Sequence, residues 1–103
     1  MGELRGKQLQ PKDIARLCHG QGWIGAADLV TAVAVCLSES QGYMRAFNDN
    51  VVDGEIKSRD CGLFQINIAA DRIGSDEEER LFADANYNVA RAWDLWERRG
   101  FQP

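Results

Sequence analysis

The sequence predicts an α+β fold that is predominantly α-helical, with a central buried helix and a small β-hairpin lobe. Three observations lead to this prediction. A long apolar segment has the length of a helix, a polar stretch rich in Gly, Asn and Asp follows it, and two helix-capping patterns come later in the chain. A chain of 103 residues is long enough for one compact domain but not for two, because each domain needs its own core. We therefore expect residues 1–103 to form a single domain.

The first helix is expected to begin at Pro11, because proline suits the first turn of a helix. Ile14 and Cys18 follow at helical spacing and give this helix an apolar face. Gly20 and Gly22 are typical of a helix end. The pattern therefore predicts a short helix.

The central helix is expected to start at about Gly25 and to contain the run AADLVTAVAVCLSES. This run is apolar on nearly every face, which is typical of a helix surrounded by other elements. The apolar stretch from Ile24 to Leu37 contains Asp28 and is too short to cross a bilayer. We therefore expect a buried core helix and no membrane insertion.

The segment from Gln41 to Asp60 has no helical period and is rich in the residues that turns require. Within it, the letters VVDGEI indicate a hairpin, because an Asp-Gly pair readily adopts the positive φ angles of a type I′ turn. The sequence therefore predicts a small β-lobe after the central helix.

Two capping patterns predict the last helices. Ser75, with Glu78 three residues later, forms a capping box that starts one helix. Asp84 is expected to cap the next helix, and Gly100 is expected to end it. The apolar face of that last helix is formed by Val89, Ala92, Trp93 and Trp96.

Composition and charge exclude several classes of protein. The chain is 45% apolar and 27% charged, as in ordinary globular domains. A net charge of −4 argues against a nucleic-acid partner, since phosphate-binding surfaces need clustered Lys and Arg. Cys18, Cys36 and Cys61 match no paired zinc or redox motif, so we expect no disulfide framework. Cys18 and Cys36 fall inside predicted helices among apolar neighbours and are expected to be small buried hydrophobic side chains.

Glu39 lies at the end of the long apolar run, where a surface helix would have turned polar earlier. Apolar surroundings disfavour the charged carboxylate and raise its pKa, which suits a group that donates a proton near neutral pH. The same position also fits a solvated glutamate in the last turn of a helix. The local pattern leaves both interpretations open.

Asp60 follows Glu39 in the sequence and stands directly before Cys61 and the letters GLFQIN. Two facing carboxyl groups are the minimum equipment for cleaving a glycosidic bond. The pair therefore favours a catalytic role for Glu39.

The letters ESQGYMRAFN and SRDCGLFQIN resemble the lysozyme superfamily, in which an ES pair at a helix end is followed by a variable β-region and then by D-x-G-[LI]-[LFM]-Q-I-N. The resemblance implies that Glu39 is the general acid and that Asp60 is the nucleophile or electrostatic stabiliser. Lysozymes are the type case of this division between two carboxyl groups. The sequence departs from animal lysozymes in two ways. The spacing from Glu39 to Asp60 is larger, and Cys61 stands where those enzymes often have Tyr.

Further residues receive roles from this resemblance. Gln65 and Asn67 match the Q-x-N of the motif and are expected to line the cleft and bind N-acetyl sugars. Asn48 is expected on the substrate side too, within the polar setting of Asp60. LFADANYNVARAW resembles a segment of bacterial and phage lysozyme-like and transglycosylase domains, so Tyr87 and Asn88 are candidates for contact with substrate or Glu39. Packing is the alternative role for this pair.

The resemblance predicts a muramidase that cleaves the β-1,4 bond between N-acetylmuramic acid and N-acetylglucosamine of peptidoglycan. A lytic transglycosylase that forms 1,6-anhydro products, and a noncatalytic glycan-binding or structural module of a phage tail or secretion apparatus, are the alternatives. No metal or organic cofactor is expected. Asp49, Asp53 and Asp60 imitate a calcium loop only in part, because the terminal bidentate Glu is missing.

The predicted substrate places the site of action at the bacterial cell wall. The first residues, MGELRGKQLQ, contain no recognisable secretory signal. We therefore expect delivery by lysis, a holin, a phage tail or injection machinery, or as a module of a longer phage or bacterial chain.

Overall fold

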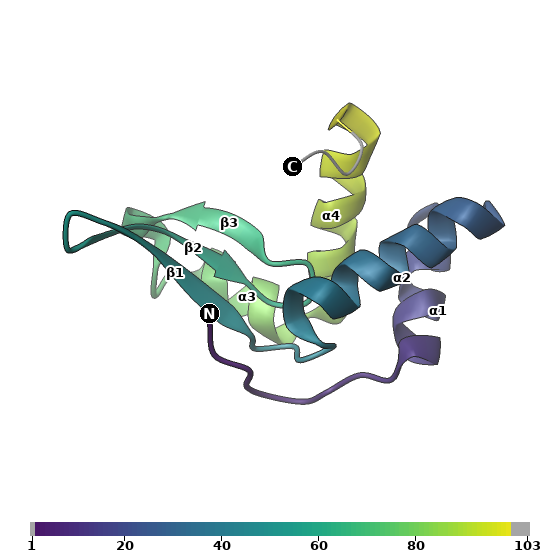
Figure 1. Cartoon of the computed structure of the whole chain (residues 1–103), viewed down its shortest axis with the longest axis horizontal. Coiled ribbons are helices and arrows are strands. Elements are labelled where there is room, and N and C mark those ends of the chain that lie inside the picture. The colour runs from purple at the N-terminus through teal and green to yellow at the C-terminus, as the bar shows by residue number, and fades with distance from the viewer. Residues whose placement is uncertain (1, 100–103) are drawn as a thin grey trace.

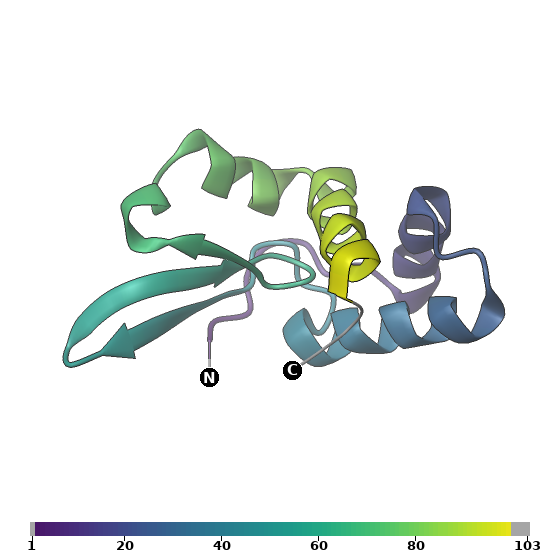
Figure 2. The same cartoon turned by 90° about the horizontal axis from the view of Figure 1, so that it is seen from above.

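A computed structural model of the chain describes residues 2–99. It shows a group of helices beside an antiparallel β-sheet, with one further helix packed against the sheet (Figures 1 and 2). The elements are, in chain order, α1 (Pro11–Gln21), α2 (Ala26–Ser40), β1 (Phe47–Val52), β2 (Glu55–Cys61), β3 (Ile66–Ala69), the 3-10 turn η1 (Ala70–Arg72), α3 (Asp76–Ala83) and α4 (Ala85–Arg99). This arrangement confirms the predicted α+β class.

The sheet has the strand order β1-β2-β3, and both neighbouring pairs are antiparallel. Asp53 and Gly54 join β1 to β2 with φ angles of 54° and 79°, as a type I′ turn requires. The predicted hairpin is therefore confirmed. The third strand was not predicted, because its four residues are too short to show a clear alternation in the sequence.

The predicted helix ends agree with the structure. Gly22 caps α1 at a φ of 146°, and its N–H donates to the carbonyl oxygens of Cys18 and His19. The Ser75 hydroxyl accepts a hydrogen bond from the Glu78 N–H at the start of α3. The expected end of the last helix at Gly100 lies outside the described residues.

The Asp84 carboxylate accepts a hydrogen bond of 3.1 Å from the Tyr87 N–H at the start of α4. This contact confirms the predicted cap. In the part of the chain that the structure describes, no helix is long and apolar enough to cross a membrane.

Helix α2 stands where it was expected, but it is buried along one face only. Ala32, Cys36 and Ser40 are its buried residues, whereas Val30 is 69% exposed. The expected burial on nearly every face is therefore not met. The reason is the small number of elements in the domain: α1 packs along one side of α2, and too few others remain to enclose it.

The core contains the three cysteines and an aromatic cluster. Cys18, Cys36 and Cys61 have no exposed surface, as expected for free cysteines in a core. Burial raises the pKa of Cys18 to about 11 and those of Cys36 and Cys61 to about 12. The aromatic cluster consists of Trp23, Phe64, Trp93 and Trp96.

Asn88 joins α4 to the turn between β2 and β3. Its side chain is fully buried, and its amide nitrogen donates to the carbonyl oxygens of Cys61 (2.9 Å) and Leu81 (3.1 Å). Its amide oxygen accepts from the Phe64 N–H at 2.9 Å. A Cβ on Gly62 would lie 2.4 Å from this amide nitrogen, so only glycine allows the close approach.

We predict that Asn88→Ala lowers the free energy of unfolding by about 2–4 kcal/mol, because three buried backbone groups lose their partner. Urea unfolding followed by circular dichroism measures this change. Asn86→Ala is the matched control, since Asn86 is exposed on the same helix and should change the stability by less than about 0.5 kcal/mol. Equal effects of the two substitutions would contradict the anchoring role of Asn88.

Candidate active site

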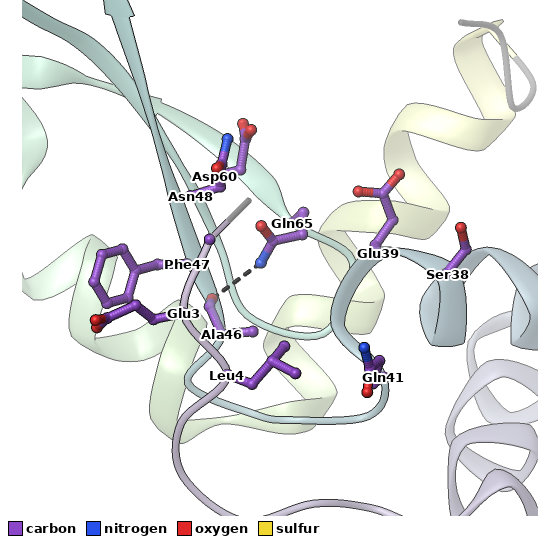
Figure 3. Close-up of a pocket in the computed structure, with 11 residues that line it drawn as sticks. Glu3, Leu4, Ser38, Glu39, Gln41, Ala46, Phe47, Asn48, Asp60 and Gln65 are labelled. Carbon is purple, nitrogen blue, oxygen red and sulfur yellow. Dashed lines mark hydrogen bonds between the residues drawn. The ribbon is translucent and has the colours of Figure 1, made fainter.

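A groove of about 420 Å³ lies between the end of α2 and the sheet. Glu39 enters it from α2, whereas Asp60 and Asn48 enter it from the sheet (Figure 3). Gln65 lies between these two sides, and the N-terminal segment Gly2–Leu4 completes the lining. The structure therefore brings the two carboxyl groups singled out in the sequence into one groove.

Glu39 occupies the last turn of α2 and is exposed. The helix end is fixed next to it, because the buried Ser40 hydroxyl donates to the Cys36 carbonyl oxygen and accepts from the Gly42 N–H. The expected apolar cover of the Glu39 carboxyl group is absent among the described residues. The carboxyl group faces the open groove instead.

Asp60 is held by amide groups from both neighbouring strands. Asn67 on β3 donates to its Oδ1 at 2.9 Å, and Asn50 on β1 donates to its Oδ2 at 3.2 Å. Asn48, Asp60 and Asn67 form one row across the sheet, since Asp60 pairs in register with both asparagines. Amide N–H groups on both oxygens orient the carboxylate.

Ser58 and Asn48 complete this network. The Ser58 hydroxyl oxygen accepts from the amides of Asn50 (3.0 Å) and Asn67 (2.9 Å). Asn48 donates to the side-chain oxygen of Asn50 at 3.3 Å. One face of the sheet therefore presents amides, a hydroxyl and one carboxylate.

The opposite face of the sheet carries an ion cluster that packs against α3. Arg59 donates to both carboxylate oxygens of Asp49 at 2.6 and 3.1 Å, and to Glu78 at 3.2 Å. Its guanidinium group also lies over the Phe47 ring, 4.4 Å from the centroid. The hydrogen bonds to Asp49 and the nearby negative charges raise the pKa of Arg59. This cluster ties β1 and β2 to α3 beneath the amide face.

Gln65 supports the floor of the groove. Its side-chain nitrogen donates to the carbonyl oxygens of Ala46 (3.0 Å; dashed in Figure 3) and Gly62 (2.9 Å). Its own backbone has a φ of 52°, in the left-handed region. The amide therefore joins the turn before β3 to the segment before β1.

The family model of the lysozyme-like domain matches residues 17–102. The chain belongs to the lysozyme-like domain family. A comparison with curated proteins and one with solved structures gave no match. Membership indicates action on, or binding to, cell-wall glycan, with peptidoglycan as the substrate.

In this lysozyme-like domain, Tyr87 and Asn88 lie away from the groove. The Tyr87 hydroxyl donates to Glu77 at 2.7 Å, and its ring packs under Arg80. Asn88 has no exposed surface and cannot touch a bound glycan in this structure. Tyr87 therefore packs between α3 and α4, and Asn88 joins α4 to the turn after β2, so both have the packing role that was the alternative for this pair.

The N-terminal segment was missed by the sequence analysis. Glu3 and Phe47 exchange two backbone hydrogen bonds of 2.8 and 3.0 Å, which hold the segment beside β1. Gly2, Glu3 and Leu4 all line the groove of the lysozyme-like domain. Neither periodicity nor a motif marks these residues, because a single strand-like pairing leaves no pattern in a short polar sequence.

We predict that Arg59→Met lowers the free energy of unfolding by about 1–3 kcal/mol, because Asp49 and Glu78 would remain partly buried without their cation. Thermal unfolding and urea unfolding measure the change in stability. Arg98→Met is the control, since Arg98 pairs with Asp94 on an exposed surface and should cost less than about 0.5 kcal/mol. A similar loss in both variants would argue against a structural role of the cluster.

Proposed function

We propose that this domain is a peptidoglycan-cleaving muramidase that hydrolyses the β-1,4 bond between N-acetylmuramic acid and N-acetylglucosamine. The observation that carries the proposal is the shared groove of Glu39 and Asp60, with Asp60 held as an oriented carboxylate by Asn50 and Asn67. An anchored carboxylate that shares a groove with a second, open carboxyl group is equipment that glycoside hydrolysis uses.

In the proposed mechanism, the Glu39 carboxyl group donates its proton to the glycosidic oxygen as the bond to the anomeric carbon breaks. Positive charge then develops on that carbon and on the ring oxygen. The Asp60 carboxylate stabilises this charge or forms a covalent bond with the carbon. Glu39, now ionised, takes a proton from a water molecule that attacks the same carbon, and both carboxyl groups return to their starting states.

Because Glu39 is exposed, we propose that the bound substrate itself shields its carboxyl group from water. A glycan in the groove would displace water from this carboxyl group and provide the cover that α2 does not provide. Asn48 and Gln65 line the groove, and Asn67 lies next to Asp60, to which it donates a hydrogen bond. We propose that Asn48 and Asn67 contact the N-acetyl sugars. Gln65 acts mainly by shaping the floor.

A lytic transglycosylase is the second candidate function. It would use the same glutamate, while the 6-hydroxyl group of the sugar replaces water and yields a 1,6-anhydro product. Such an enzyme does not require an anchored carboxylate at the position of Asp60. The two amide hydrogen bonds to Asp60 therefore favour hydrolysis. A noncatalytic module would need neither carboxyl group in the groove.

We predict that Glu39→Gln lowers the rate of glycan cleavage by about 10²–10⁴-fold, because the amide cannot donate the required proton. Release of soluble fragments from purified peptidoglycan measures the rate. Glu97→Gln makes the same chemical change at an exposed position on α4 and should keep full activity. Unchanged cleavage by folded Glu39→Gln protein would remove Glu39 from the mechanism.

We predict that the wild-type products carry reducing ends and that Asp60→Asn lowers their formation by at least about 10²-fold, because the neutral amide cannot stabilise the developing positive charge. Mass spectrometry of the muropeptides identifies the ends. Asp53→Asn, at the exposed hairpin turn, is the control. Anhydro ends would exclude the hydrolase in favour of the transglycosylase, and absence of any product from folded wild-type protein would favour a binding module.

A further inference from the structure

The N-terminal segment Gly2–Leu4 forms one wall of the groove that contains Glu39 and Asp60. The match to the lysozyme-like domain begins only at residue 17, so this wall lies outside the matched region. We infer that the segment is a substrate-binding element of this chain in which Leu4 packs against the apolar face of a bound sugar. The inference rests on the proposed function, because it names a contact within the same groove.

The segment is firmly attached to the chain that leads into β1. Beyond the pair between Glu3 and Phe47, the Arg45 N–H donates to the Arg5 carbonyl oxygen at 2.9 Å, and the Met44 N–H donates to that of Lys7 at 2.9 Å. Two backbone hydrogen bonds at Glu3, and two more at the residues that follow the wall, therefore hold it in place. A segment held in this way can contribute to binding without being ordered by the ligand.

Gly2 lets the segment lie close against the start of β1. A Cβ at this position would lie 2.0 Å from the Phe47 carbonyl oxygen and 2.9 Å from the Asn48 Cβ. Any side chain at Gly2 would therefore push the segment away from Asn48. The wall and the row of polar groups that holds Asp60 thus meet at Asn48.

Alternation along the segment decides which side chain faces the groove. Glu3 and Arg5 form an ion pair, and the Arg5 guanidinium group lies 5.7 Å from the centroid of the Phe47 ring. Side chains of neighbouring residues in an extended segment point to opposite sides, which turns Leu4 away from this pair. Figure 3 shows Leu4 pointing toward Gln41 in the lower part of the groove.

Leu4 is 42% exposed, although it stands in a groove lined mainly by polar side chains. Sugars combine hydroxyl groups around their edge with faces of C–H groups, and N-acetyl groups add a methyl group. A leucine beside polar side chains matches this mixture, since apolar contact and hydrogen bonds then act on one ring. The bound sugar would remove the exposed part of Leu4 from water.

The test measures binding without cleavage. Glu39→Gln protein is titrated calorimetrically with a peptide-free tetrasaccharide of alternating N-acetylglucosamine and N-acetylmuramic acid. Adding Leu4→Ala should raise the Kd roughly fivefold, because part of the buried apolar contact is lost. Adding Leu4→Met should restore most of the affinity. Ile24→Ala, an apolar truncation at a residue that is 74% exposed and lies outside the groove lining, should leave the Kd unchanged.

A second variant tests the attachment of the wall. Gly2→Ala should weaken binding as Leu4→Ala does, because the added Cβ displaces the segment from Phe47. Circular dichroism checks that each variant is folded. An unchanged Kd in folded Leu4→Ala protein, or equal weakening by Ile24→Ala, would overturn the inference.

The two proposals fail in different ways. Cleavage by the wild-type protein together with a Kd that does not depend on Leu4 would overturn this inference and support the muramidase proposal. Binding that depends on Leu4 together with no cleavage would overturn the muramidase proposal and support the wall. Absence of any binding to the tetrasaccharide would overturn the wall as a sugar-binding element, whatever the cleavage assay shows.

Discussion

The side-chain amide of Asn88 binds three backbone groups that come from three separate parts of the chain. It reaches the carbonyl of Cys61 at the end of β2, the N–H of Phe64 in the following turn and the carbonyl of Leu81 in α3. That turn leads from the strand of Asp60 to the strand of Asn67 and contains Gln65 in the floor of the groove. The arrangement of the sheet side of the site therefore depends on one buried amide that never touches the groove.

Local signals in the sequence predicted most of the elements. Pro11, Gly22, Ser75 and Asp84 mark helix ends through their own backbone preferences or short-range hydrogen bonds, and these effects need no distant partner. The Asp-Gly turn is also a local property. The polar surroundings of Asp60 could be expected as well, since Asn50 and Ser58 come from the hairpin that the turn itself brings together.

Features that depend on distant contacts could not be predicted in the same way. Glu39 is exposed because few elements surround α2. The run AADLVTAVAVCLSES does not show how many elements will pack against the helix. Asn88 matched a motif in the sequence, but its burial arises only when α4 packs on the turn after β2. The wall at Gly2–Leu4 depends on pairing with a segment some forty residues away in the sequence. Pattern analysis identifies residues and local turns, whereas these roles arise from long-range packing.

The two carboxyl groups of the groove differ in how the surrounding residues hold them. Asp60 receives two amide hydrogen bonds and belongs to a sheet that an ion cluster ties to α3 from behind, so its position is set before any ligand binds. Glu39 is placed by a capped helix end, but its carboxyl group remains open to water. A stabilising carboxylate needs a fixed position and a constant charge, whereas a proton donor gains from surroundings that change when substrate covers it. The two carboxyl groups therefore differ in how firmly the fold holds them before a ligand binds.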